Sequence, residues 1–102
     1  MIALLLVANL VLAQADCKAN LLNASNAGIV TDASVDGSGV HIVVSEDIWR
    51  RLSFAAKQSL ADTVNCAIAG AGGSLASIDF LSDMTNRSLG HWSPIGGLSI
   101  SK

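Results

Sequence analysis

Apolar residues follow three different patterns along the chain, and each pattern predicts a different kind of segment. Residues 1–13 are almost uniformly apolar, with Asn9 the one clearly polar residue among them. Residues 48–68 repeat apolar side chains at spacings of three and four, which is typical of an amphipathic helix. Residues 40–44 are rich in β-branched side chains and residues 76–80 alternate apolar with polar ones, as strands do. We therefore expect one α+β domain behind an apolar N-terminus.

One long amphipathic helix is predicted between Ser45 and Gly70. Ser45 is a good N-cap, and Glu46 and Asp47 place carboxylates in the first turn, where they complement the helix dipole. The apolar stripe expected to face the core consists of Ile48, Leu52, Ala55, Ala56, Leu60, Val64, Ala67 and Ile68. Gly70 is expected to end the helix, because glycine readily adopts the left-handed conformation that follows a helix C-terminus.

Four strands are predicted around this helix, one before it and three after it. They are Val40–Val44, Ser74–Ser82, Arg87–Ser93 and Leu98–Ser101. Turn-forming residues at 83–86 and 94–97 separate the last three strands, so these should form hairpins. The predicted fold class is α+β, with one long amphipathic helix packed on a small, mostly antiparallel sheet in the order β-α-β-β-β. Whether Val40–Val44 lies at the centre or at an edge of the sheet is left open.

The N-terminal segment, residues 1–15, is predicted to be a secretory signal peptide. Its apolar run is shorter than the roughly 20 residues that span a bilayer. A cut after Ala15 fits the small-x-small pattern of Ala13, Gln14 and Ala15, and a cut after Ala13 is the alternative. Because no Lys or Arg precedes the run, an uncleaved membrane anchor and a buried element of the fold stay open. Cleavage would leave no stable membrane span and would place the protein in the periplasm or outside the cell.

The remaining chain divides into two parts by composition. Residues 16–38 are rich in Asn, Ala, Ser, Asp and Gly, and within them only residues 28–31 resemble a strand. We interpret residues 16–38 as an irregular N-terminal arm with at most one short edge strand. Residues 39–102 form the predicted compact α+β domain.

Two cysteines, Cys17 and Cys66, are predicted to form a disulfide bond. An exported protein folds in an oxidising compartment, where paired cysteines stabilise domains too small for a large core. Two buried free thiols are the alternative interpretation. A catalytic thiol is not expected, because the chain has no CxxC motif and no local signature of a Cys-His pair.

Charge and composition exclude several classes of partner. Charged residues make up 14% of the chain and the net charge is -2, so nucleic acid and anionic lipid are not expected partners. No cofactor is predicted. The glycine-rich loop at residues 70–73 follows a helix instead of preceding one, so it lacks the context of a phosphate-binding loop.

The histidines are the main candidates for chemistry. His41 and His91 could meet if their strands are neighbours, and with Asp79 or Asp83 they could then form a metal site or an acid-base pair. The two histidines lack the short spacing of metal ligands, and no Gly-x-Ser-x-Gly motif is present. We therefore predict no catalytic and no metal-binding residues.

The tryptophans and the neighbouring arginines are the candidate partner-binding residues. Trp49 lies in the first turn of the predicted helix, next to Arg50 and Arg51, and Trp92 precedes the last turn. Packing in the core is one interpretation of both tryptophans. Exposed aromatic anchors for a partner are the other, because tryptophan and arginine are enriched at binding hot spots.

Together these features predict a small exported protein that is not an enzyme and acts as an interaction or accessory module for a protein partner. An unpaired edge strand would also permit a homodimer. The alternative is a small-ligand-binding domain with a pocket between helix and sheet, lined by Phe54, Phe80 and Trp92. An enzyme would instead require a histidine beside Asp79, Asp83 or a serine within a cleft.

Overall fold

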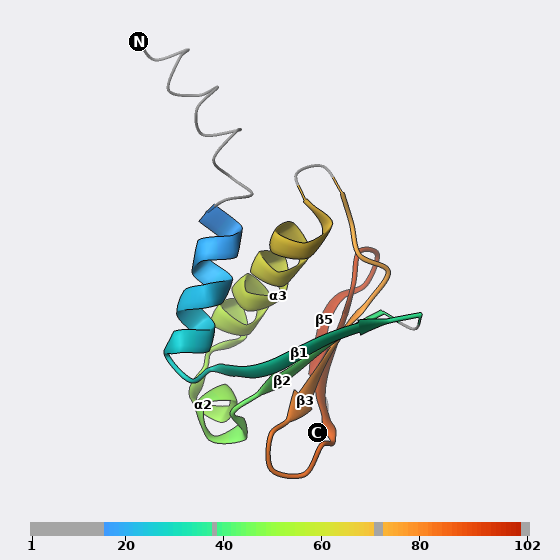
Figure 1. Ribbon diagram of the computed structural model, residues 1–102. Coiled ribbons are helices and arrows are strands. Elements are labelled where there is room, and N and C mark those ends of the chain that lie inside the picture. The colour runs from blue at the N-terminus through green and yellow to red at the C-terminus, as the bar shows by residue number, and fades with distance from the viewer. Residues whose placement is uncertain (1–15, 38, 71–72, 101–102) are drawn as a thin grey trace.

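The computed structural model describes residues 16–37, 39–70 and 73–100. Within this part of the chain, five strands form one sheet and three helices pack against one of its faces (Figure 1). The predicted α+β class is confirmed. The predicted signal peptide, residues 1–15, lies outside the described residues.

The strands lie side by side in the same order as they occur in the chain, β1-β2-β3-β4-β5. Their bounds are β1 Val30–Asp36, β2 Gly39–Val44, β3 Ile78–Ser82, β4 Ser88–Ser93 and β5 Gly97–Ile100. The β2–β3 pair is parallel, and the other three pairs are antiparallel. The predicted order β-α-β-β-β is therefore found from β2 onward, with the strand over residues 40–44 inside the sheet.

The predicted single helix is two helices, α2 (Glu46–Arg51) and α3 (Phe54–Ala69). The chain is extended at Leu52, with φ -72° and ψ 140°, and the Ser53 hydroxyl then accepts a hydrogen bond from the Ala56 N–H at 3.1 Å. Ser53 thus acts as a second N-cap. The sequence pattern did not indicate this break, because the apolar stripe continues across Ser53 and serine also occurs inside helices.

Both predicted ends of this helical region are confirmed. The Ser45 hydroxyl accepts a hydrogen bond from the Ile48 N–H at 3.3 Å, so Ser45 caps α2. Gly70 follows α3 with a φ of 86°, a conformation that a residue with a Cβ rarely adopts.

In its described part, residues 16–37, the arm expected to be irregular is mostly regular structure, and the edge strand expected near residues 28–31 is found as β1. Residues 16–26 are helical, and β1 follows as an edge strand paired with β2. Leu21, Ala24 and Ile29 pack against the core, so this segment belongs to the same domain. The N-terminal helix has few apolar positions, so its sequence shows no clear helical periodicity. Strand β1 is stabilised by its pairing with β2, which the local sequence does not reveal.

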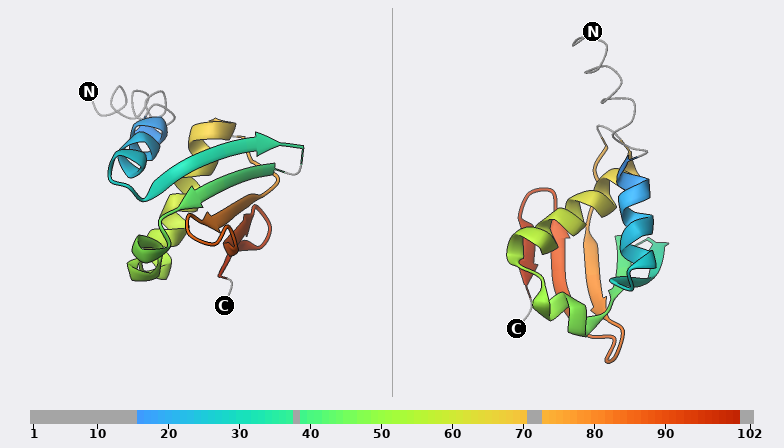
Figure 2. Two further views of the ribbon diagram at one scale, coloured as in Figure 1. Left: turned by 60° about the horizontal axis from the view of Figure 1, so that its bottom comes forward. Right: turned by 90° about the vertical axis from the view of Figure 1, so that its left-hand side faces the viewer.

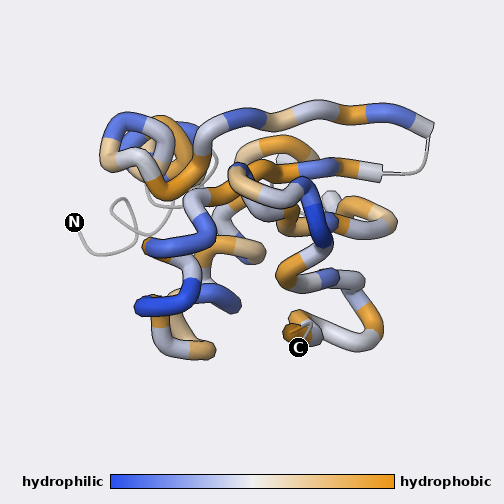
Figure 3. The backbone as a smooth tube through the Cα atoms, turned by 90° about the horizontal axis from the view of Figure 1, so that it is seen from below, coloured by the Kyte–Doolittle hydropathy of each residue, from blue (hydrophilic) through white to orange (hydrophobic). Residues whose placement is uncertain are grey.

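The core lies between the sheet and the helices. Alternate residues of β2, β3 and β4 are buried, whereas β1 buries only Val30 and β5 only Leu98. Figure 3 shows hydrophobic and hydrophilic residues along the backbone of the helices and strands. The fully buried core residues include Val40, Ile42, Val44, Val64, Ile78 and Phe80. As the alternation over residues 76–80 predicted, Ile78 and Phe80 point inward and Asp79 points outward. The strand begins later than predicted, at Ile78; before it, the Leu75 N–H donates a hydrogen bond to the Asn65 side chain of α3 at 2.7 Å.

Trp49, with Trp92, is one of two tryptophans buried in this core. Its ring stacks on Phe80 with centroids 5.0 Å apart, and the side chain is buried. A Cβ added at Gly90 would lie 3.2 Å from Cζ2 of Trp49, so the glycine lets the indole approach the sheet backbone.

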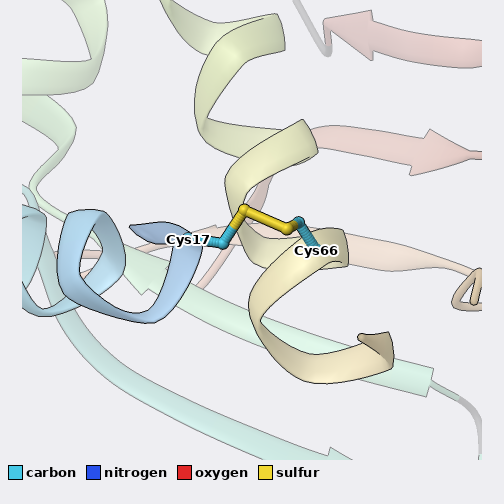
Figure 4. The surroundings of a disulfide bond; sticks show 2 residues. All are labelled: Cys17 and Cys66. Atoms are coloured by element: carbon cyan, nitrogen blue, oxygen red, sulfur yellow. A yellow bond between two sulfur atoms is a disulfide. The ribbon is translucent and has the colours of Figure 1, made fainter. Parts of the chain in front are cut away.

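The predicted disulfide bond between Cys17 and Cys66 is present, with a Cα–Cα distance of 5.8 Å. It joins the N-terminal helix to the last turns of α3 (Figure 4). The two cysteines are 49 residues apart, so the bond closes a loop that includes β1, β2 and α2.

We expect Cys66→Ser to lower the free energy of unfolding by about 4 kcal/mol, because a loop of this length loses considerable conformational entropy in the unfolded chain when it is closed. Urea denaturation of the protein under oxidising conditions measures the difference. Cys17→Ser should have the same effect as Cys66→Ser, and the double variant should add nothing further. An unchanged denaturation midpoint in Cys66→Ser would contradict a stabilising role for the bond.

We expect Gly90→Val to lower the free energy of unfolding by about 1–3 kcal/mol, because the added side chain would displace Trp49 from the sheet. Thermal denaturation and tryptophan fluorescence report the change. Gly37→Val is the matched control, since a Cβ at Gly37 would meet no atom within 4 Å. Equal stability of the two variants would show that the close packing at Gly90 is unimportant.

Candidate functional site

A basic groove lies where α2, the start of α3 and the ends of β4 and β5 meet. Its volume is about 440 Å³. Three of the six basic residues of the chain line it, namely Arg50, Lys57 and Arg87. They come from α2, α3 and the β3–β4 turn, so only the tertiary structure brings them together.

The groove is positively charged although the chain has a net charge of -2. Glu46 is the one acidic residue that lines it, and its carboxylate is paired with the Arg50 guanidinium at 2.6 Å. Within the described part of the chain, Lys57 and Arg87 form no ion pair. Two positive charges are thus available to an anionic ligand.

Apolar side chains form the rest of the lining. Trp49 contributes part of its otherwise buried ring, and the Lys57 Nζ lies 5.3 Å from the centroid of that ring. This distance is within the range of a cation–π interaction, which holds the ammonium group over the indole. Leu89 and Ile100 complete the apolar part. The site therefore combines charge with a surface that can receive the aliphatic part of a ligand.

The β3–β4 turn that carries Arg87 is held by local hydrogen bonds. The buried Ser82 hydroxyl accepts hydrogen bonds from the N–H groups of Met84 and Thr85 at 3.0 and 3.1 Å. Asn86 adopts a left-handed conformation with φ 60° just before Arg87. Because the turn is fixed in this way, Arg87 projects from a defined backbone.

The same turn is tied to α2 on the other side of the groove. The Asp83 carboxylate accepts a hydrogen bond from the Glu46 N–H at 3.0 Å, and the Asp83 N–H donates to the Val44 carbonyl at 3.0 Å. A carboxylate at the start of α2 satisfies a free amide of its first turn. These two hydrogen bonds join the two walls of the groove.

The structure separates the four candidate partner-binding residues. Trp49 and Arg50 line the basic groove. Arg51 lies outside the set of lining residues and pairs with Asp47 at 2.9 Å on an exposed surface. Trp92 is buried in the core against the helices, so neither tryptophan is a fully exposed anchor. Sequence reasoning missed Lys57 and Arg87, because residues so far apart in the chain share no local pattern.

Of the three residues expected to line an internal pocket, two are in the core and one is on the surface. Phe80 and Trp92 are part of the close-packed core, whereas the Phe54 side chain is 56% exposed at the start of α3. An apolar groove of about 460 Å³ is found elsewhere, between the N-terminal helix, α3 and β1. Ile68, which was predicted to face the core, is partly exposed and lines this second groove.

The histidines do come together, on the face of the sheet opposite the helices. Cross-strand register aligns Ser34, His41, Asp79, His91 and Ser99 in one row over all five strands. The His91 Nδ1 lies 2.6 Å from one Asp79 oxygen, and the His41 Nδ1 lies 3.6 Å from the other. The His41 Nε2 also lies 3.2 Å from the Asp36 carboxylate. His41 thus bridges the carboxylates of two strands.

This row has residue types that acid-base pairs use. None of its members lines either of the two grooves, and His91 is half exposed on the sheet face. In the described residues, no group of three or more His, Cys, Asp or Glu side chains has a geometry suited to a metal ion.

A bilayer-spanning helix is not found among the residues that the structure describes. No protein-family model, no curated protein and no solved structure matches the chain. The fold and the grooves therefore supply the evidence on function.

Proposed function

We propose that this protein is a small exported interaction module that binds an acidic segment of a protein partner in the basic groove, without catalysis. The observation that carries this proposal is the gathering of Arg50, Lys57 and Arg87 around one groove in a chain of net negative charge. Such local complementarity steers association and determines which partners fit.

A protein segment suits the lining better than a nucleic acid does. Two uncompensated cations beside Trp49, Leu89 and Ile100 match carboxylate side chains with aliphatic stems. A polyanion would also meet the negative charge of the remaining surface, since the net charge of the whole chain is -2. An anionic small molecule is the second candidate, because a volume of about 440 Å³ lies in the range of ligand pockets.

Export is supported by two features. The Cys17–Cys66 bond is typical of proteins that fold in an oxidising compartment. The apolar residues 1–13 with a small-x-small pattern at 13–15 resemble a signal peptide. The proposed location is therefore the periplasm or the cell exterior.

We expect Arg87→Glu to weaken binding of an acidic peptide about tenfold or more, because a repulsive charge replaces an attractive one. The probe is a fluorescent eight-residue peptide of alternating glutamate and threonine, measured by fluorescence anisotropy at low salt. Arg51→Glu is the matched control, since it makes the same charge change on α2 outside the groove. Equal weakening by both substitutions would indicate a nonspecific charge effect and refute the groove. A preference for citrate over the peptide would favour the small-molecule alternative.

We expect the protein recovered from its native host to lack residues 1–13 or 1–15 and to gain the mass of about two hydrogens on reduction. Intact-mass spectrometry with and without reductant measures both changes. A full-length mass with free thiols would contradict export and the disulfide bond together.

A further inference from the structure

Resting on the proposed function, the geometry points to strand addition at β5: an extended acidic segment of the partner pairs with this edge and directs alternate side chains into the basic groove. Among the residues that the structure describes, β5 is the last strand of the sheet and pairs with β4 on one side only. An edge strand presents N–H and C=O groups that an added strand can bond.

The open edge and the groove share a residue. Ile100 is the last residue of β5 and also lines the groove, and α3, which carries Lys57, packs over the same strand. The right-hand view in Figure 2 shows β5 at one margin of the sheet with α2 and the start of α3 beside it. A segment paired with β5 would therefore pass along the groove.

The periodicity of a strand fits this arrangement. Alternate side chains of an added strand project to the same face, about 7 Å apart, and the four residues of β5 span about 13 Å. Two acidic side chains of the added strand could thus face the groove cations, while the intervening residues would face the polar side of the sheet near Ser99.

The opposite edge of the sheet is unsuited to the same ligand. Strand β1 carries Asp32 and Asp36 and has a register shift between Val30 and Asp32, which interrupts regular pairing. Strand β5 has no charged residue, and the neighbouring groove is basic. Charge therefore selects β5 over β1 for an acidic segment.

Two backbone-modified forms of the alternating glutamate-threonine peptide test this inference. One is N-methylated at every glutamate and the other at every threonine, so both keep their charges. Because alternate residues of a strand direct their N–H groups to the same edge, one form should lose binding at least about tenfold and the other should stay within about threefold. Hydrogen exchange should slow at Gly97–Ile100 on binding of the unmodified peptide and stay unchanged at Val30–Asp36.

The outcomes separate this inference from the proposed function. If both methylated forms bind as tightly as the unmodified peptide and Arg87→Glu still weakens binding, the groove binds acidic segments without strand addition. Protection at β1 in place of β5, or loss of binding by both methylated forms, would likewise overturn the inference. If the unmodified peptide does not bind at all, the proposed function fails with it.

Discussion

The parallel pairing of β2 with β3 is the constraint on which the rest of the structure depends. Parallel neighbours cannot be joined by a tight turn, so the chain between them must cross the sheet, and here it does so through α2 and α3. Ile42 of β2 and Phe80 of β3 are buried on the face of the sheet that the helices cover. The remaining strands extend this pair outward by antiparallel hairpins.

This crossover gives the sheet two unlike faces. One face carries the helices and the core, and the other holds the row that contains His41, Asp79 and His91. A sheet dominated by antiparallel pairs tolerates such a solvated face. The two edges differ as well, because β5 adjoins the basic groove and β1 adjoins the apolar one. The helix that begins the crossover, α2, is also the wall that carries Arg50, so the crossover and the basic groove depend on the same segment.

A domain of this size buries few apolar residues, and its N-terminal segment adds contacts that stabilise it. The helix over residues 16–26 adds Leu21 and Ala24 to the core, and Cys17 joins that helix covalently to α3. The disulfide bond adds a covalent link to the apolar contacts that hold this segment against the domain. The described N-terminal residues are therefore part of the fold, and the bond gives a reason for two cysteines so far apart in the chain.

Local patterns in the sequence determined the elements whose signals are strong: the α+β class, the caps at Ser45 and Gly70, the inward-facing Ile78 and Phe80, and the disulfide partners. The break at Ser53, the N-terminal helix and β1 had no comparable signal, because their stability comes from packing and strand pairing. The meeting of Arg50, Lys57 and Arg87 was likewise decided by tertiary structure alone. Sequence periodicity reports which face of an element is apolar, whereas a site built from three elements depends on how those elements are placed in space.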